Sequence, residues 1–212
     1  MAQTHIDHPN SSIRLRAALA AGSAPDPDRA AELISRCAVE PDFFVRDMLT
    51  WALTRMPAPV TVPLLHAELD SAVPQARSQA LHTLSKIGRA DAASTWTAVL
   101  ALVGDRDDDV ARAAWRTVVA LVPQDARRSA ARALAGRLGH GDGETRRSLS
   151  RALMGLDEEG VEALVAAEGA ADPRVAEHVA DTIRLMQDPD SGLHDAVHEA
   201  RRLAALGPRG EE

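Results

Sequence analysis

Residues 42–53, with the sequence DFFVRDMLTWAL, contain the pattern on which the fold depends. Asp42 is followed four residues later by Arg46, and small or apolar residues lie three, six and seven positions after that arginine. Aspartate is a favoured helix N-cap, and this apolar spacing places the small and apolar side chains on one face of a helix. The stretch therefore predicts the start of an amphipathic helix.

The same pattern recurs along the chain. Its marker position is occupied by Arg14, Arg46, Arg77, Arg112, Arg146 and, in the sixth copy, Ala176. The intervals between these positions are 32, 31, 35, 34 and 30 residues. A period of this length is typical of repeat proteins, in which each copy is one structural unit and stacked copies share a continuous core.

The copies predict six helices near residues 10–22, 42–56, 73–87, 107–121, 142–155 and 172–187. Five of them have a suitable N-cap residue: Asn10, Asp42, Asp108, Asp142 and Asp172. The third copy has Val73 there, so Ser71 or a water must replace the cap. Pro, Gly and Asp cluster between these helices, and a second helix fits in each interval: roughly 26–40, 59–70, 90–103, 124–138, 158–169 and 190–206.

Composition narrows the class of protein. Hydrophobic residues make up 45% of the 212 residues but aromatic residues only 2%, so the core must consist of Ala, Leu and Val between closely packed helices. The formal net charge of −7 disfavours nucleic acid as a partner, since phosphate contacts require a basic excess. With Cys37 as the single cysteine, no disulfide forms within the chain, and we expect a cytoplasmic protein without a membrane span.

The motif Asp-x-x-x-Arg-x-x-Ala-x-x-Ala-Leu resembles the signature of HEAT and HEAT-like repeats, and the resemblance covers nearly the whole chain. It implies an all-α fold, a right-handed α-solenoid of about six helix pairs. We expect one domain at residues 1–206 and a disordered tail at 207–212. Residues 40–57 also resemble actinobacterial HEAT proteins, some of which are fused to a MerR-type DNA-binding domain. No such domain is evident in this sequence, so we do not infer a role in transcription from this resemblance.

The resemblance also suggests a role for the repeated arginine. In HEAT-like proteins the arginine-bearing helices usually line the concave surface, and the arginine often bonds a neighbouring repeat. We therefore expect a structural ladder formed by Arg14, Arg46, Arg77, Arg112 and Arg146. A residue that recurs at the same place in each copy is more simply explained by structure than by ligand binding.

Function in a repeat array is expected where the copies differ. A helical-wheel projection places Leu15, Ala18, Leu19, Ala113 and Thr117, among others, on the open face. From that face we predict a set of partner-binding residues: Phe43, Asp47, Thr50, Trp51, Leu81, His82, Arg116, Arg147 and Arg151. The face changes from apolar to basic along the chain. Its occupant would be a protein, a peptide or an amphipathic small molecule with an anionic end.

Two interpretations of the aromatic residues on this face stay open. Trp51 and Phe43 either line a binding groove, as exposed apolar patches often do, or pack beneath a neighbouring loop. The other tryptophans, Trp96 and Trp115, are predicted to be packed in the interior.

The sequence contains no strong enzyme motif, and we predict no catalytic, cofactor-binding or metal-binding residue. His194, His198 and Glu199 share a helix face without forming a recognised metal motif. Cys37 is interpreted as a buried structural thiol. The alternative to a non-catalytic binding module is a HEAT-like DNA glycosylase. In that interpretation, Trp51 and Asp47 would be the tryptophan and the carboxylate that hold damaged DNA in the groove. The acidic net charge argues against it, and a further analogy to phycobilin lyases has no residue-specific support.

Overall fold

The computed structural model describes residues 5–88 and 92–188, and all regular structure within them is helical. Its α-helices are α1 (Ser11–Ser23), α2 (Ala30–Cys37), α3 (Phe43–Thr54), α4 (Ala58–Leu69), α5 (Pro74–Ile87), α6 (Ala92–Ala101), α7 (Asp108–Leu121), α8 (Arg127–Ala135), α9 (Gly143–Met154), α10 (Asp157–Ala167) and α11 (Pro173–Gln187). None of the helices in these ranges is long and apolar enough to cross a membrane. The helix expected at 190–206 and the tail at 207–212 lie outside the described residues.

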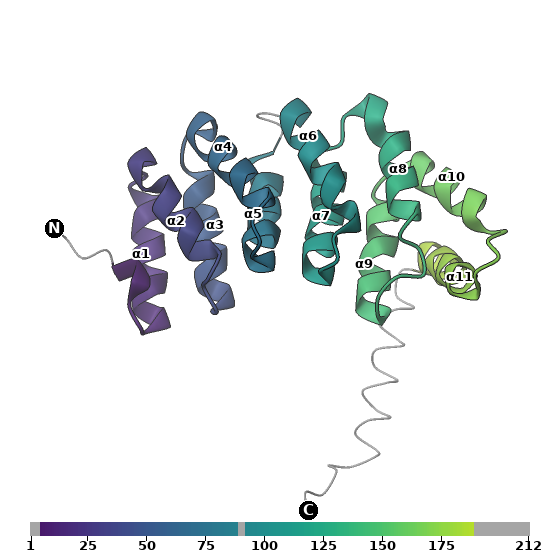
Figure 1. The fold of residues 1–212 in the computed structure, drawn as a ribbon, viewed down its shortest axis with the longest axis horizontal. Coiled ribbons are helices and arrows are strands. Elements are labelled where there is room, and N and C mark those ends of the chain that lie inside the picture. Colours follow the sequence, from purple (N-terminus) through teal and green to yellow (C-terminus); the bar gives the residue numbers. More distant parts are fainter. Residues whose placement is uncertain (1–4, 89–91, 189–212) are drawn as a thin grey trace, which may run out of the picture.

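The helices follow one another across the molecule in sequence order (Figure 1). The first row consists of the odd-numbered helices, and each of them contacts the next, from α1 against α3 to α9 against α11. The second row consists of the even-numbered helices, with contacts of α2 against α4, α4 against α6 and α8 against α10. The core lies between the rows and is built mainly from Ala, Leu and Val.

The first-row helices each begin one residue after the predicted start, because the prediction counted the N-cap residue as helical. Helices α2 and α8 begin later than expected, because a three-residue 3-10 turn precedes each of them: η2 (Pro27–Arg29) and η5 (Gln124–Ala126). Two more 3-10 turns complete the described structure: η1 (His5–Asp7) and η4 (Leu102–Gly104).

The N-cap predictions were correct for Asn10, Asp42, Asp142 and Asp172, whose side chains accept hydrogen bonds from backbone amides of the first turn. The prediction was wrong for Asp108, which is the first residue of α7. Asp107 is the cap instead and accepts from the amides of Asp109 and Val110. In the aspartate run of residues 107–109, each residue could cap, so the sequence alone did not determine the register.

At the start of α5 the Ser71 side chain does not replace the cap. The N-cap residue Val73 provides no side-chain acceptor, and the Ser71 hydroxyl accepts only from the amide of Val73 itself, at 3.3 Å. Pro74 at the first helical position has no N–H that needs an acceptor, which reduces the cost of the missing cap.

The fully buried Trp115 fills the core of the central repeats, as predicted. Its indole Nε1–H donates to the carbonyl oxygen of Val103 at 2.9 Å, so the one polar atom of the ring is satisfied. Trp96, in the second row, is half-buried and packs against the same core.

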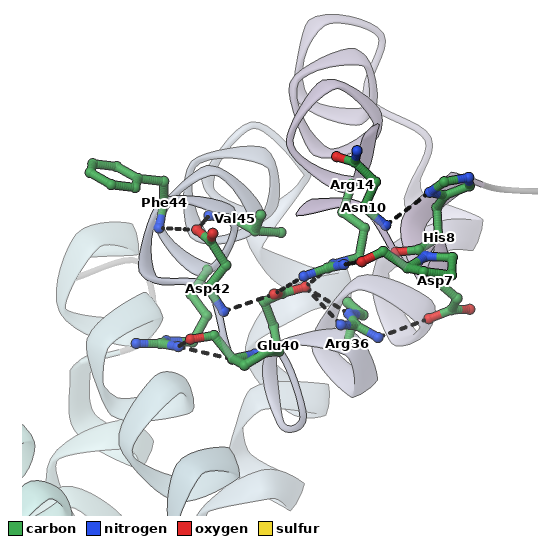
Figure 2. Close-up of polar contacts among 12 residues, drawn as sticks. Asp7, His8, Asn10, Arg14, Arg36, Glu40, Asp42, Phe44 and Val45 are labelled. Carbon is green, nitrogen blue, oxygen red and sulfur yellow. Dashed lines mark hydrogen bonds and ion pairs between the residues drawn. The ribbon is translucent and has the colours of Figure 1, made fainter. Parts of the chain in front are cut away.

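A buried carboxylate joins the first three helices (Figure 2). Glu40, between α2 and α3, has 0% of its surface exposed and accepts two hydrogen bonds of 2.7 Å from the guanidinium of Arg14. It also accepts from Arg36 and from the backbone amide of Asp42. Burial alone would raise the pKa of Glu40, but these hydrogen bonds outweigh it and lower the pKa to about 2. The cluster therefore favours a charged carboxylate at the junction of α1, α2 and α3.

We expect Glu40→Gln to lower the free energy of unfolding by about 3–5 kcal/mol, because it leaves the buried Arg14 charge without a carboxylate. Chemical denaturation at pH 7 measures this loss. The pKa of Glu40 is lower in the folded chain, so its stabilisation is present above the unfolded pKa and is lost as pH falls towards 2. The acid-induced loss should accordingly be smaller in Glu40→Gln.

Glu162→Gln is the matched control, because the Glu162–Arg128 pair is exposed and worth at most about 1 kcal/mol. An equal loss of stability in the two variants would contradict the role assigned to Glu40.

Candidate binding groove

An open groove of about 1110 Å³ lies over α3, α5 and α7. It contains four of the predicted binding residues, Phe43, Asp47, His82 and Arg116. The other residues that line it are Arg46, Pro74, Gln75, Ser78, Gln79, Ser85, Lys86, Asp107, Asp109, Arg112, Ala113, Thr117, Ala120 and Glu144. Most of this lining is polar or charged, whereas the sequence predicted an apolar start to the open face.

The distance from the N-cap determines which residue of each first-row helix is open to solvent. The ninth residue after the cap is exposed or half-exposed in every one of these helices: Leu19, Trp51, His82, Arg116, Arg151 and Asp181. We call this set the ninth-position row. The eighth residue is buried in the first five helices: Ala18, Thr50, Leu81, Trp115 and Ser150. The boundary between core and open surface therefore falls between two adjacent residues.

The predictions of Thr50 and Leu81 as binding residues were wrong. Thr50 is buried where α3 meets α5, with its Oγ1 atom 3.5 Å from Oγ1 of Thr83. Leu81 is fully buried in the core. The wheel treated each helix as packed on one side only, but α5 contacts α3 and α7 as well as the second row. The open arc is consequently narrower than the projection assumed.

Three other residues assigned to the open face, Ala18, Ala113 and Thr117, are also buried. The two in α7 were misplaced because α7 starts at the Asp107 cap, which shifts its register by one residue relative to the alignment on arginine. Arg147 and Arg151 on α9 are exposed, as expected, but they do not line the groove.

Trp51 is 38% exposed and packs against the preceding repeat. A Cβ atom added at Gly22 of α1 would lie 2.1 Å from Cζ3 of the Trp51 ring, so the indole lies directly on the glycine backbone. Phe43 is 63% exposed at the edge of the groove, edge-to-face with Phe44, and the Arg46 guanidinium lies 5.9 Å from the centre of its ring. One face of the Trp51 ring is therefore covered by α1, whereas the Phe43 ring is exposed and accessible to a ligand.

Four of the five repeated arginines bond a carboxylate that lies either at the junction with the following repeat or in its first helix. Besides Arg14 with Glu40, these pairs are Arg77 with Asp105 at 3.0 Å, Arg112 with Glu144 at 2.7 Å and Arg146 with Glu177 at 3.1 Å. Arg46 differs and donates to the carbonyl oxygens of Glu40 and Pro41. The second and third repeats are joined instead by Gln75 on α5. Its side-chain amide donates hydrogen bonds to the backbone carbonyls of Cys37 and Glu40.

Several groove carboxylates are engaged in the fold. Asp107 caps α7, and Asp109 and Glu144 both pair with Arg112. By contrast, neither Lys86 nor Arg116 has a hydrogen-bond or ion-pair partner among the described residues. The cations that remain uncommitted therefore meet on α5 and α7.

The pKa values in the groove reflect this concentration of positive charge. Burial, followed by the charges of Lys86 and Arg116, lowers the pKa of His82, while Asp47 acts in the opposite direction. Burial and the neighbouring Arg112 lower the pKa of Arg116. The groove residues missed by the sequence reasoning include Gln75, Gln79 and Lys86. A signal for Lys86 existed, since it lies one helical turn after His82.

The described residues contain no cluster of three or more His, Cys, Asp or Glu side chains able to hold a metal. Cys37 is buried, and burial raises the pKa of its thiol to about 12, which keeps it protonated and unreactive at neutral pH. His194, His198 and Glu199 lie outside the described residues.

We expect Gly22→Ala to destabilise the chain by about 1–3 kcal/mol, because the new methyl group displaces the Trp51 ring. Thermal denaturation followed by tryptophan fluorescence measures the loss. In a Trp51→Ala background the same change should cost less, since the clash with the ring is gone. Gly169→Ala is the control, because nothing lies within 4 Å of its added Cβ. Equal costs of Gly22→Ala in both backgrounds would contradict this contact.

Comparisons with known proteins assign no family. No family model matches the chain, and no curated protein matches it. Among solved structures, the crystal structure of an engineered protein, a target of the Northeast Structural Genomics Consortium, is similar over 88% of this chain and 97% of its own. Its sequence identity is 16% and the TM-score is 0.47, a likeness too distant to support an inference about fold or function.

Proposed function

We propose that the chain is a right-handed α-solenoid of the HEAT type that acts as a non-catalytic binding module. Its groove over α3, α5 and α7 would hold an extended peptide segment of a partner protein. The observation that carries the proposal is the groove itself, which crosses three successive first-row helices and changes from aromatic at Phe43 to cationic at Arg116.

The arrangement of the helices supports the solenoid. Contacts connect each first-row helix to the next, and copies of one motif recur every 30–35 residues. In such arrays each repeat mainly contacts its neighbours, and the extended surface of one row is the usual binding face. The ninth-position row provides a surface of this kind, with a different side chain in each repeat.

The size and the chemistry of the groove favour a peptide over a small molecule. Small-molecule sites are typically enclosed, mostly apolar and about 300–1000 Å³ in volume. This groove is at the upper end of that range in volume, but it is open and is lined mainly by polar and charged residues. The side-chain amide of Gln79 is both a donor and an acceptor, which matches the alternating N–H and C=O groups of a peptide backbone.

The alternative, a DNA-repair enzyme, would need a water-activating acid beside an extended cationic surface. Among the described carboxylates with shifted pKa values, Glu40, Asp105, Asp142 and Glu159, every pKa is lowered. A general acid or base in a groove would instead have a raised pKa. Trp51 also packs on Gly22, so one face of its ring is already covered, and it does not line the groove.

We expect Ala120→Trp to weaken peptide binding by at least about tenfold, because the indole would fill the groove at an exposed position of its lining. Peptides would be selected from a phage-displayed random library against the full chain, and their affinities measured by calorimetry. The matched control is Ala166→Trp on α10, an exposed alanine in the second row that does not line the groove.

Equal affinity of the selected peptides for the two variants would overturn the groove as the binding site. Salt-sensitive binding of duplex DNA that is lost in Ala120→Trp, with no peptide selected, would favour the repair enzyme.

A further inference from the structure

Three cationic or titratable side chains meet on the floor of the groove. His82 and Lys86 are one turn apart on α5, and Arg116 is on α7, the helix that packs beside α5. Lys86 and Arg116 both line the same groove as His82, and each lowers the pKa of the His82 ring. Two neighbouring helices therefore present one concentrated positive site.

Arg116 differs from the arginines that join the repeats. Arg14 and Arg77 each make a bidentate pair with a carboxylate, and Arg112 bridges Asp109 and Glu144. Arg116 has no such partner among the described residues, and burial lowers its pKa. The ninth-position row holds leucine, tryptophan and histidine in the three preceding helices and arginine again only at Arg151, which does not line the groove, so this cation is not repeated in every helix.

We propose that His82, Lys86 and Arg116 form a subsite that binds an anionic oxygen group, a carboxylate or a phosphate, of the ligand held in the groove. This proposal rests on the groove being the binding site. The ligand class is then narrowed to an acidic or phosphorylated peptide segment.

Charge complementarity supports an anion at this position. Asp109 and Glu144 are paired with Arg112, and although Asp109 acts on Arg116 and Asp47 acts on His82, neither forms an ion pair with the cluster among the described residues. The guanidinium of Arg116 provides a planar pair of donors suited to a carboxylate or phosphate, and the Lys86 ammonium adds a point charge. A bound anion would relieve the repulsion among these cations in a partly desolvated groove, where electrostatic interactions are stronger than in water.

The subsite also couples binding to pH. The charged groups that face His82 are Lys86 on its own helix, Arg116 on α7 and Asp47 on α3. The two cations and burial favour neutral His82, whereas a bound anion favours the protonated ring. By reciprocity, protonation of His82 tightens anion binding, so affinity rises as pH falls through the pKa of His82.

The test is an NMR titration of the His82 imidazole in the full chain between pH 5 and 8, assigned by comparison with His82→Gln. The probes are sodium sulfate, a tetrahedral dianion whose charge is constant over this range, and sodium acetate, a carboxylate. Sodium chloride at matched ionic strength corrects for screening. The variant is Arg116→Ala, and the control is Arg16→Ala, which removes an exposed arginine from α1, away from the groove.

We expect sulfate or acetate to raise the pKa of His82 beyond the chloride control in the native chain and in Arg16→Ala, and to do so less in Arg116→Ala. A response to sulfate alone would indicate that the anionic group of the ligand is a phosphate. A response to both sulfate and acetate would indicate that the subsite also binds carboxylates. No rise beyond chloride, or the same rise in Arg116→Ala, would overturn the subsite. Because the probes are simple anions, this result is independent of whether the selected peptides bind.

Discussion

The N-terminal amides of each first-row helix require a hydrogen-bond acceptor, and the residue that provides it determines the surface of the whole molecule. In five of the six helices that acceptor is an Asn or Asp side chain. The cap fixes the residue at which the helix begins, and the helical repeat then fixes which side chain is open nine residues later. A shift of one residue in the cap therefore exchanges a buried residue for an exposed one.

The fourth repeat illustrates this constraint. Its arginine, Arg112, is the fifth residue after the cap, whereas Arg14, Arg46, Arg77 and Arg146 are the fourth. Alignment on the arginine consequently placed Thr117 on the open face, although Thr117 is buried and donates to the carbonyls of Leu81 and Ala113. The sequence predicted the described helices, and the starts of the first-row helices to within one residue, because caps and apolar spacing are local. The register of α7 was ambiguous among three adjacent aspartates, and only packing resolves it.

The site was harder to predict than the fold for a related reason. Burial of Leu81 depends on both neighbouring helices, which are about 30 residues away in sequence. Lys86 was missed because it lies near the end of α5, where the repeated motif has already finished. His82 was identified because it interrupts a row that is apolar in the first two helices, and Arg116 because the alignment on arginine placed it on the open face beside that row, at the position of Thr50. Departures from a repeat are thus readable from sequence, whereas the boundaries of the open surface require the packed structure.

The charged groups divide into those that form bonds between neighbouring helices and those that do not. Glu40 and Asp105 are bonded by arginines at the junctions of repeats, and these bonds lower their pKa values although burial alone would raise them. At the last junction, His178 accepts from the amide of Gly139 through Nδ1, and its Nε2 lies 2.9 Å from the carbonyl oxygen of Arg146. These groups connect helices, so changing them alters stability.

Lys86 and Arg116 form no hydrogen bond or ion pair with another described residue. Removing either of them would break no such contact and would relieve its repulsion with protonated His82. The folded chain therefore presents two exposed cations in the groove, where they could pair with a bound anion. Lys86 and Arg116 are not among the charged residues that join the repeats, although Arg112 and Glu144 both join repeats and line the groove, so substitutions at Lys86 and Arg116 can test binding separately from folding. The proposed binding role would use such a separation: the arginine bonds hold the helices in place, and the ninth-position row carries a different side chain in nearly every helix.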